Sequence, residues 1–199
     1  MITKYSLKLV ITCLACTSIL SGCGLLLRSI VDSTNYVNNS NIFRQGQHGE
    51  LSKDELEEAK IAWKYFDNNY NLATGMISSI DHGTTTSMWD IADYIAALVS
   101  AQQLEIISNI QFDERLTKIL TFLNTMQLFD NKIPNKYYSV MNGDKVDLNG
   151  TRADYGWSAV EIGRLLIWLK ILSIRYPNYS EYIDKAILRW SFCDIIDIS

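Results

Sequence analysis

The chain has 199 residues, 48% of them hydrophobic, which is enough for one domain with a substantial core. Its formal net charge is −4. We therefore expect no nucleic-acid-binding surface, because binding to phosphates requires clustered Lys and Arg side chains. We also expect no cofactor and no metal site, since the two histidines, His48 and His82, lie in a polar segment and a loop far apart in the sequence.

The N-terminus has the pattern of a secretory signal. Two lysines precede an apolar run from Leu9 to Leu20 that is short for a bilayer span, and Leu20-Ser21-Gly22-Cys23 follows. These four residues resemble the bacterial lipobox. The resemblance implies a signal peptide over residues 1–22, lipidation of Cys23, and a lipoprotein whose lipid holds it to a membrane of the bacterial cell envelope. Gly24 resembles the residue found in lipoproteins sent to the outer membrane, facing the periplasm. The alternative is an ordinary signal peptide or an uncleaved anchor.

Cleavage at this position would change the charge and the cysteine content. Loss of Lys4 and Lys8 makes the mature chain two charges more negative than −4. Cys13 and Cys16 are removed and Cys193 remains alone, so we expect no intramolecular disulfide, and we expect Cys193 to be a small buried residue. Residues 23–50 are rich in Asn, Ser, Gln and Gly, which predicts a flexible tether.

The ordered part begins with an amphipathic helix from Leu51 to about Asn69, in which Ser52 and Glu55 have the spacing of a capping box. Next, a polar loop at Thr84–Thr86 leads into a helix that starts near Ser87 and runs to Ala101. Its body is small or apolar on nearly every face. This second helix is predicted to be an inner helix, packed on all sides.

The remaining segments continue this alternation. An amphipathic helix is predicted over Phe112–Met126, a long irregular stretch over Asp130–Tyr155, and an apolar helix over Gly156–Leu172. Pro177 then interrupts the chain before an amphipathic helix over Glu181–Trp190. Paired tyrosines in the irregular stretch favour a surface that binds a ligand.

The two apolar helices repeat one pattern. Ser87-x-x-Asp90 aligns with Ser158-x-x-Glu161, and Leu98 aligns with Leu169. When helices alternate between amphipathic and apolar in an antiparallel chain, the apolar helices run parallel and begin at the same face. The predicted fold is all-α, a partial α/α toroid of helical hairpins, about half of an (α/α)6 barrel. Five residues are expected at the shared face: Trp89, Asp90, Tyr155, Trp157 and Glu161.

Several ordered motifs carry a family resemblance. They are Trp63-Lys64-Tyr65-Phe66, Thr86-Ser87-Met88-Trp89-Asp90, Asn135-Lys136-Tyr137-Tyr138, Gly156-Trp157-Ser158-Ala159, Ile162-Gly163-Arg164-Leu165-Leu166 and Arg189-Trp190-Ser191-Phe192-Cys193. From Leu51 onwards the chain resembles the bacterial family DUF3131. The resemblance implies a glucoamylase-like toroid associated with envelope polysaccharide, and it supplies no catalytic residues to transfer. It also implies that residues 51–199 are the N-terminal part of a truncated toroid with exposed apolar helix faces.

Asp90 and Glu161 are the candidate catalytic residues, because glycosidases place two carboxyl groups on either side of the scissile bond. Helix capping is the competing explanation and the one that we favour for both residues, since each follows a serine by three positions. Asp147 and Asp154, both in the irregular stretch, are alternative candidate acids with equally little support.

Four residues are candidates for binding substrate: Trp89, Tyr155, Trp157 and Arg164. Aromatic rings can stack on the apolar faces of sugars, although Trp89 and Trp157 could equally be core residues. Core packing is preferred for Trp63, Trp168 and Trp190. Arg164 follows Glu161 by three positions, so a buried structural pair between them is preferred to a substrate clamp.

Two functional hypotheses follow. The first is an envelope-anchored lipoprotein whose toroid binds or processes a polysaccharide, with glycoside-hydrolase-like chemistry if it is active. The second is a non-catalytic structural or interaction module of the cell envelope. A third possibility is that the truncated chain is inactive.

Overall fold

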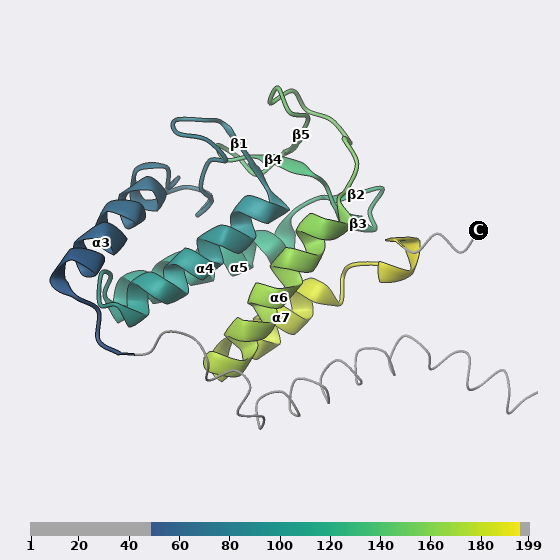
Figure 1. Cartoon of the computed structure of the whole chain (residues 1–199). Helices are drawn as coiled ribbons and strands as arrows, with labels where there is room; N and C mark the ends of the chain where they lie inside the picture. Colours follow the sequence, from purple (N-terminus) through teal and green to yellow (C-terminus); the bar gives the residue numbers. More distant parts are fainter. Residues whose placement is uncertain (1–48, 196–199) are drawn as a thin grey trace, which may run out of the picture. The chain divides into compact units, whose positions relative to one another are not determined.

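The computed structural model describes residues 49–195 (Figure 1). The predicted signal peptide, the lipidation site at Cys23 and nearly all of the predicted tether lie outside these residues. Within them there are five α-helices: α3 (Lys53–Asn68), α4 (Met88–Gln103), α5 (Asn109–Thr125), α6 (Ala159–Arg175) and α7 (Ser180–Ile187). Two 3-10 helices, η2 (Pro177–Tyr179) and η3 (Phe192–Ile195), flank α7. No helix in this part of the chain is long and apolar enough to cross a membrane.

Serine side chains cap the N-termini of four helices, and the fourth of these serines is Ser158 at α6. Ser52, Ser87 and Ser108 each form a complete capping box with the side chain three residues later, at the N-termini of α3, α4 and α5. The predicted boxes of α3 and α4 are thus confirmed. Helix α5 begins three residues earlier than predicted, because Ser108 and Gln111 form a box that the sequence reading missed.

Helices α4 and α6 lie side by side and run parallel, as predicted (Figure 1). Near their N-termini, Nε of Arg164 donates to Oδ1 of Asp93 at 2.7 Å. Just beyond the C-terminal end of α6, the Tyr176 hydroxyl donates to the side chain of Gln102 on α4 at 2.8 Å. These two contacts fix the register of the helices, so that both begin at one end of the domain, which we call the N-terminal face.

The helix-rich character of the predicted fold is confirmed, but the prediction of a wholly irregular stretch from Asp130 to Tyr155 is wrong. Strands β4 (Tyr137–Ser139) and β5 (Lys145–Val146) form an antiparallel sheet with β1 (Thr85–Ser87), in the order β1-β4-β5. Strands β2 (Leu128–Phe129) and β3 (Ile133–Pro134) form a separate hairpin. Strands of two or three residues are too short to show the period-two alternation that marks a strand in a sequence.

The core lies between α4, α5, α6 and α7, and it contains the fully buried Tyr94, Leu98, Leu116 and Leu169. The tryptophans expected in the core lie there: Trp63 and Trp190 are buried, and Trp168 packs against the cluster. The expectation of a buried Cys193 is wrong, because this residue lies in the short η3 helix and is exposed.

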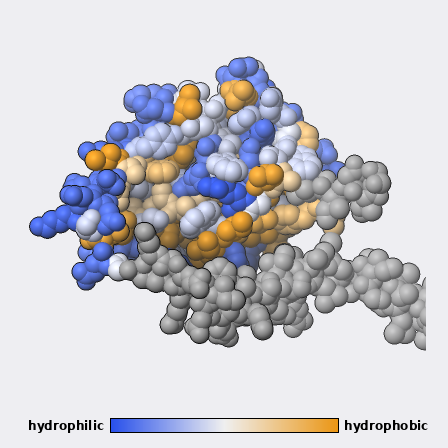
Figure 2. Space-filling view, in the orientation of Figure 1, coloured by the Kyte–Doolittle hydropathy of each residue, from blue (hydrophilic) through white to orange (hydrophobic). Residues whose placement is uncertain are grey.

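One face of α6 is apolar and exposed, as the resemblance implied for helices of a partial ring. Val160, Ile167 and Ile174 recur every seven residues and are 71%, 62% and 46% exposed. Figure 2 shows hydrophobic residues gathered over the middle of α6, with hydrophilic residues between the N-terminal parts of α4 and α6. A stripe of large apolar side chains on a helix is usually covered by another element.

Candidate functional site

Asp90 and Glu161 lie at equivalent positions in the first turns of α4 and α6, on the N-terminal face. The Asp90 carboxylate is held by three donors, all of which reach its Oδ2 atom. The Ser87 N–H donates at 2.9 Å, the Ser87 hydroxyl donates at 2.6 Å, and the Ser79 hydroxyl donates as well. The Asp90 carboxylate therefore serves as the cap of α4, which is the structural role that the sequence favoured.

Glu161 differs from Asp90, so the capping explanation holds for only one of the two acids. Its backbone N–H donates to the Ser158 hydroxyl at 3.4 Å, but its carboxylate does not return a bond to the Ser158 backbone. Among the described residues, Oε2 of Glu161 is buried and has no hydrogen-bond partner. A buried polar atom without a partner is costly, and such atoms in folded proteins call for an explanation.

The surroundings of Glu161 favour its protonated form. Burial raises the pKa of Glu161 above its ordinary value, and the nearby negative charge of Asp90 raises it further. The Lys136 ammonium and a hydrogen bond from Ser158 act in the opposite direction and lower this pKa, but the net shift is upward. Glu161 therefore keeps its proton to a higher pH than an ordinary glutamate, which is a property that a general acid needs.

Arg164 pairs with Asp93, which corrects the predicted pair with Glu161. Both of its side-chain contacts reach Oδ1 of Asp93 on α4, and its guanidinium lies 4.2 Å from the ring centroid of Trp89. The side chains of Arg164 and Asp93 are 39% and 36% exposed. The prediction of a buried pair is therefore wrong. The parallel register of α4 and α6 brings Asp93 within reach across the interface.

Three of the candidate aromatic residues are exposed at this end of the domain. Trp89, Tyr155 and Trp157 are 39%, 49% and 36% exposed, so core packing does not account for them. Tyr155 packs against Tyr137 of β4, and their ring centroids are 5.4 Å apart. Trp157 lies just before α6, and Trp89 lies in the first turn of α4, where Arg164 covers one side of its ring.

The alternative acids, Asp147 and Asp154, both make structural contacts. Asp154 forms an ion pair with Lys145, and Oδ1 of Asp147 accepts the backbone N–H groups of Asn149 and Thr151 at 2.9 Å in a turn. These contacts explain both residues without catalysis. Residues 49–193, whose side chains are described, contain no cluster of three or more His, Cys, Asp or Glu side chains that could hold a metal ion.

Residues 57–197 match the profile of DUF3131, a protein family of unknown function. This chain belongs to the DUF3131 family. The match covers more than half of the chain and includes the N-terminal face, from α4 to α6. A comparison with curated proteins gave no match.

The DUF3131 chain is also similar to a crystal structure of a putative glucoamylase from Bacteroides uniformis ATCC 8492. The TM-score is 0.53 and the identity 18%, over 72% of this chain and 36% of that chain. At this identity the similarity shows the fold alone, which is helix-rich and similar to that of the matched structure. The DUF3131 chain spans about a third of the length of the matched structure.

The sequence patterns of this DUF3131 domain did not predict three contributors to the site, Ser79, Asp93 and Lys136, and they indicated Tyr137 only as one of two paired tyrosines. Asp93 could have been found by extending the repeat, since it aligns with Arg164. Tyr137 and Lys136 lie in a motif that carried the family resemblance, but only the tertiary structure brings them beside Tyr155 and Glu161. Ser79 had no local signal, because it precedes Asp90 by eleven residues.

Proposed function

We propose that the N-terminal face binds and cleaves a polysaccharide, with Glu161 as the proton donor and Asp90 as the second carboxyl group. The observation that carries this proposal is the buried Oε2 atom of Glu161, which has no partner among the described residues and lies close to the Asp90 charge. Glycoside hydrolysis needs one protonated carboxyl group for the leaving oxygen and one carboxylate for the water or the sugar carbon.

The exposed aromatic residues provide the binding surface. Trp89, Trp157 and Tyr155 lie at the same end of the domain as the two carboxyl groups, and sugar rings present apolar C–H faces that pack on aromatic rings. Arg164 positions the Trp89 ring and does not bind substrate through its charge. Its guanidinium forms an ion pair with Asp93 and stacks on Trp89.

The described helices make up about half of a ring of paired helices. Helices α4 and α6 form the inner layer of this partial toroid, and α3, α5 and α7 form the outer layer. Support comes from the parallel register of α4 and α6, from the exposed apolar stripe on α6, and from the length of the matched structure, of which this chain covers 36%.

The chain is proposed to act in the bacterial cell envelope, lipid-anchored through Cys23 to the outer membrane and facing the periplasm. The support is the Leu20-Ser21-Gly22-Cys23 sequence, with Gly24 after the cysteine. A membrane fractionation of the chain and its Cys23→Ser variant tests the anchor. Loss of the variant from the membrane fraction supports it, whereas an unchanged distribution contradicts it.

Catalysis is tested with the full-length chain on a panel of starch, β-glucan, chitin and alginate, by measuring released reducing ends. Turnover by the wild type that disappears in Glu161→Gln, and persists in the control Glu181→Gln on α7, supports the assignment. Turnover that survives Glu161→Gln contradicts it.

A non-catalytic envelope module is the second candidate, and one observation favours it: the Asp90 carboxylate is fully explained as a helix cap. Binding of a polysaccharide with no product release by the wild type would favour this second function.

A further inference from the structure

We propose that Tyr137 and Tyr155 form a second sugar-binding subsite on the N-terminal face, and that Asn135 is the residue that positions it. This inference rests on the proposed function, because the subsite binds further pyranose units of the same polysaccharide that reaches Glu161.

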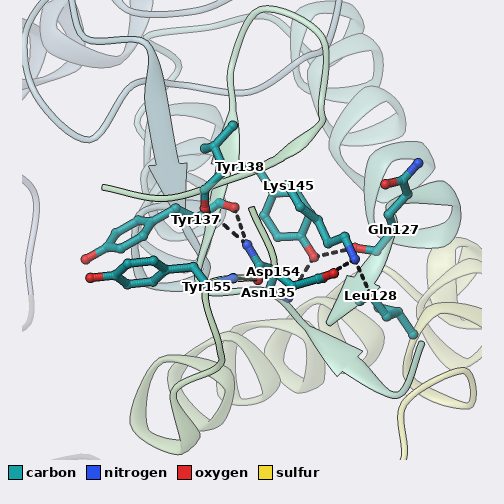
Figure 3. Close-up of polar contacts among 9 residues, drawn as sticks. Gln127, Leu128, Asn135, Tyr137, Tyr138, Lys145, Asp154 and Tyr155 are labelled. Atoms are coloured by element: carbon teal, nitrogen blue, oxygen red, sulfur yellow. Dashed lines mark hydrogen bonds and ion pairs between the residues drawn. The ribbon is translucent and has the colours of Figure 1, made fainter. Parts of the chain in front are cut away.

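The two tyrosines form one aromatic platform. Their ring centroids are 5.4 Å apart and their planes are inclined by 53°. Tyr155 is 49% exposed, whereas Tyr137 is half-buried and supports it from β4. Figure 3 shows both rings extending in the same direction, away from Asn135. A pair of this kind offers a pyranose ring a broad apolar surface with hydroxyl groups at its edge.

A single buried amide fixes the backbone of both tyrosines. The side chain of Asn135 is completely buried, and its Nδ2 donates to the Tyr137 carbonyl at 2.8 Å and to the Val146 carbonyl at 3.3 Å. Its Oδ1 accepts the backbone N–H of Tyr155 at 2.9 Å (Figure 3). Each polar atom of the Asn135 side chain therefore has a partner, and the two segments that carry the rings are joined at one point.

Neighbouring contacts hold the same two segments together. The backbone N–H of Lys136 donates to the Gly156 carbonyl at 2.7 Å. On the other side of Asn135, Lys145 pairs with Asp154 and also donates to the Leu128 carbonyl at 3.0 Å. The platform is thus fixed before a ligand arrives, which reduces the entropy lost on binding.

The position of the platform defines the kind of ligand. Glu161 follows Tyr155 by six positions, so their backbones are at most about 22 Å apart. An extended glycan chain can span this distance, and the subsite is assigned to sugar units beyond those held at Glu161. The subsite therefore predicts that affinity increases with the number of sugar units.

Calorimetric titration of the full-length chain with maltose-, cellobiose- and chitobiose-type oligosaccharides of two to seven units tests the subsite. For the series that binds, Tyr155→Ala and Tyr137→Ala should weaken binding of the longest probe by about tenfold, leave the two-unit probe unchanged, and abolish the dependence on length. Tyr155→Phe should bind like the wild type. Tyr182→Ala, an exposed tyrosine of α7, is the matched control and should also bind like the wild type.

The Asn135→Asp variant tests positioning, because it keeps the acceptor and loses both Nδ2 donors. A selective loss for long probes supports the role of Asn135. If this variant does not fold, the alanine variants of the two tyrosines still decide the matter. Binding of long probes that Tyr137→Ala and Tyr155→Ala leave unchanged overturns the subsite alone. A wild type that binds no probe of any series, and none of the polysaccharides in the panel, overturns the proposed function as well.

Discussion

Asp93 and Arg164 occupy equivalent positions of the internal repeat, 71 residues apart, and they bind each other at 2.7 Å. Asp93 lies on α4 and Arg164 lies on α6, which runs parallel to it. A contact between equivalent positions means that α4 and α6 are aligned along their axes. Asp90 and Glu161, in the first turns of these helices, therefore lie at the same end of the domain. The geometry of the candidate site follows from this alignment.

The coupling of Asp93 and Arg164 can be measured with a double-mutant cycle of Asp93→Ala and Arg164→Ala in urea. Because the pair is about two-fifths exposed, we expect a coupling free energy of about 0.5–1 kcal/mol. The pair Glu57–Lys60 on α3 is more exposed and is the control, with an expected coupling smaller than that of Asp93 and Arg164. Strictly additive effects of Asp93→Ala and Arg164→Ala would show that the pair does not align the helices.

Replacement of Asp90 by alanine should lower the free energy of unfolding by about 1–3 kcal/mol. The change removes the carboxylate half of the capping box of α4 and leaves the Ser79 hydroxyl without its acceptor. Thermal unfolding monitored by circular dichroism checks this. Asp54→Ala, in the exposed first turn of α3, is the control and should change stability by less than about 0.5 kcal/mol. Equal effects of the two changes would contradict the capping role of Asp90.

Glu161→Gln should stabilise the fold at neutral pH. The folded-state pKa of Glu161 is raised, so ionisation of this carboxyl group removes stability as the pH rises through the unfolded and then the folded pKa. Glutamine does not titrate and avoids this loss. The Tm of the variant should match that of the wild type at acidic pH, below about 4, and exceed it at pH 7. A variant that is less stable than the wild type at pH 7 would mean that the Glu161 carboxylate makes a stabilising contact.

Two glycines should respond to alanine in opposite directions. Gly75 has a φ of +76°, and a Cβ atom there would overlap the side chain of Lys118, so Gly75→Ala should destabilise the domain by about 2 kcal/mol or more. Gly163 lies inside α6, and no described atom approaches its Cβ position within 4 Å. Gly163→Ala should therefore stabilise by about 0.5–1 kcal/mol. Urea unfolding of both variants tests these two predictions. A loss of stability in Gly163→Ala would contradict the second one, because it would mean that another element packs against Gly163.

The helices and the location of the site could be predicted from local patterns. Ser-x-x-acid spacing predicts the starts of α3 and α4, and the apolar character of two segments predicts the helices α4 and α6 that lie side by side. The repeat of Ser87-x-x-Asp90 at Ser158-x-x-Glu161 then brought both candidate acids to one face.

The differences between the two acids could not be predicted, because they depend on contacts from elsewhere in the chain. Ser79 reaches Asp90 from the segment before β1, and Lys136 affects Glu161 from the segment before β4. For the same reason Arg164 was assigned to the acid nearest in sequence, whereas its partner lies across the helix interface. The side chain of Asn135 bonds the backbones of Tyr137, Val146 and Tyr155, and no local sequence pattern predicts these contacts.

The indole N–H signals of the tryptophans test most directly whether the proposed glycan site lies on the N-terminal face. The measurement is a two-dimensional NMR titration of the full-length chain with the oligosaccharide that binds most tightly. The signals of Trp89 and Trp157, both exposed on the N-terminal face, should shift, while those of the buried Trp63 and Trp190 should not. Shifts at Trp63, beside the groove between α3 and α4, with none at Trp157, would contradict the claim.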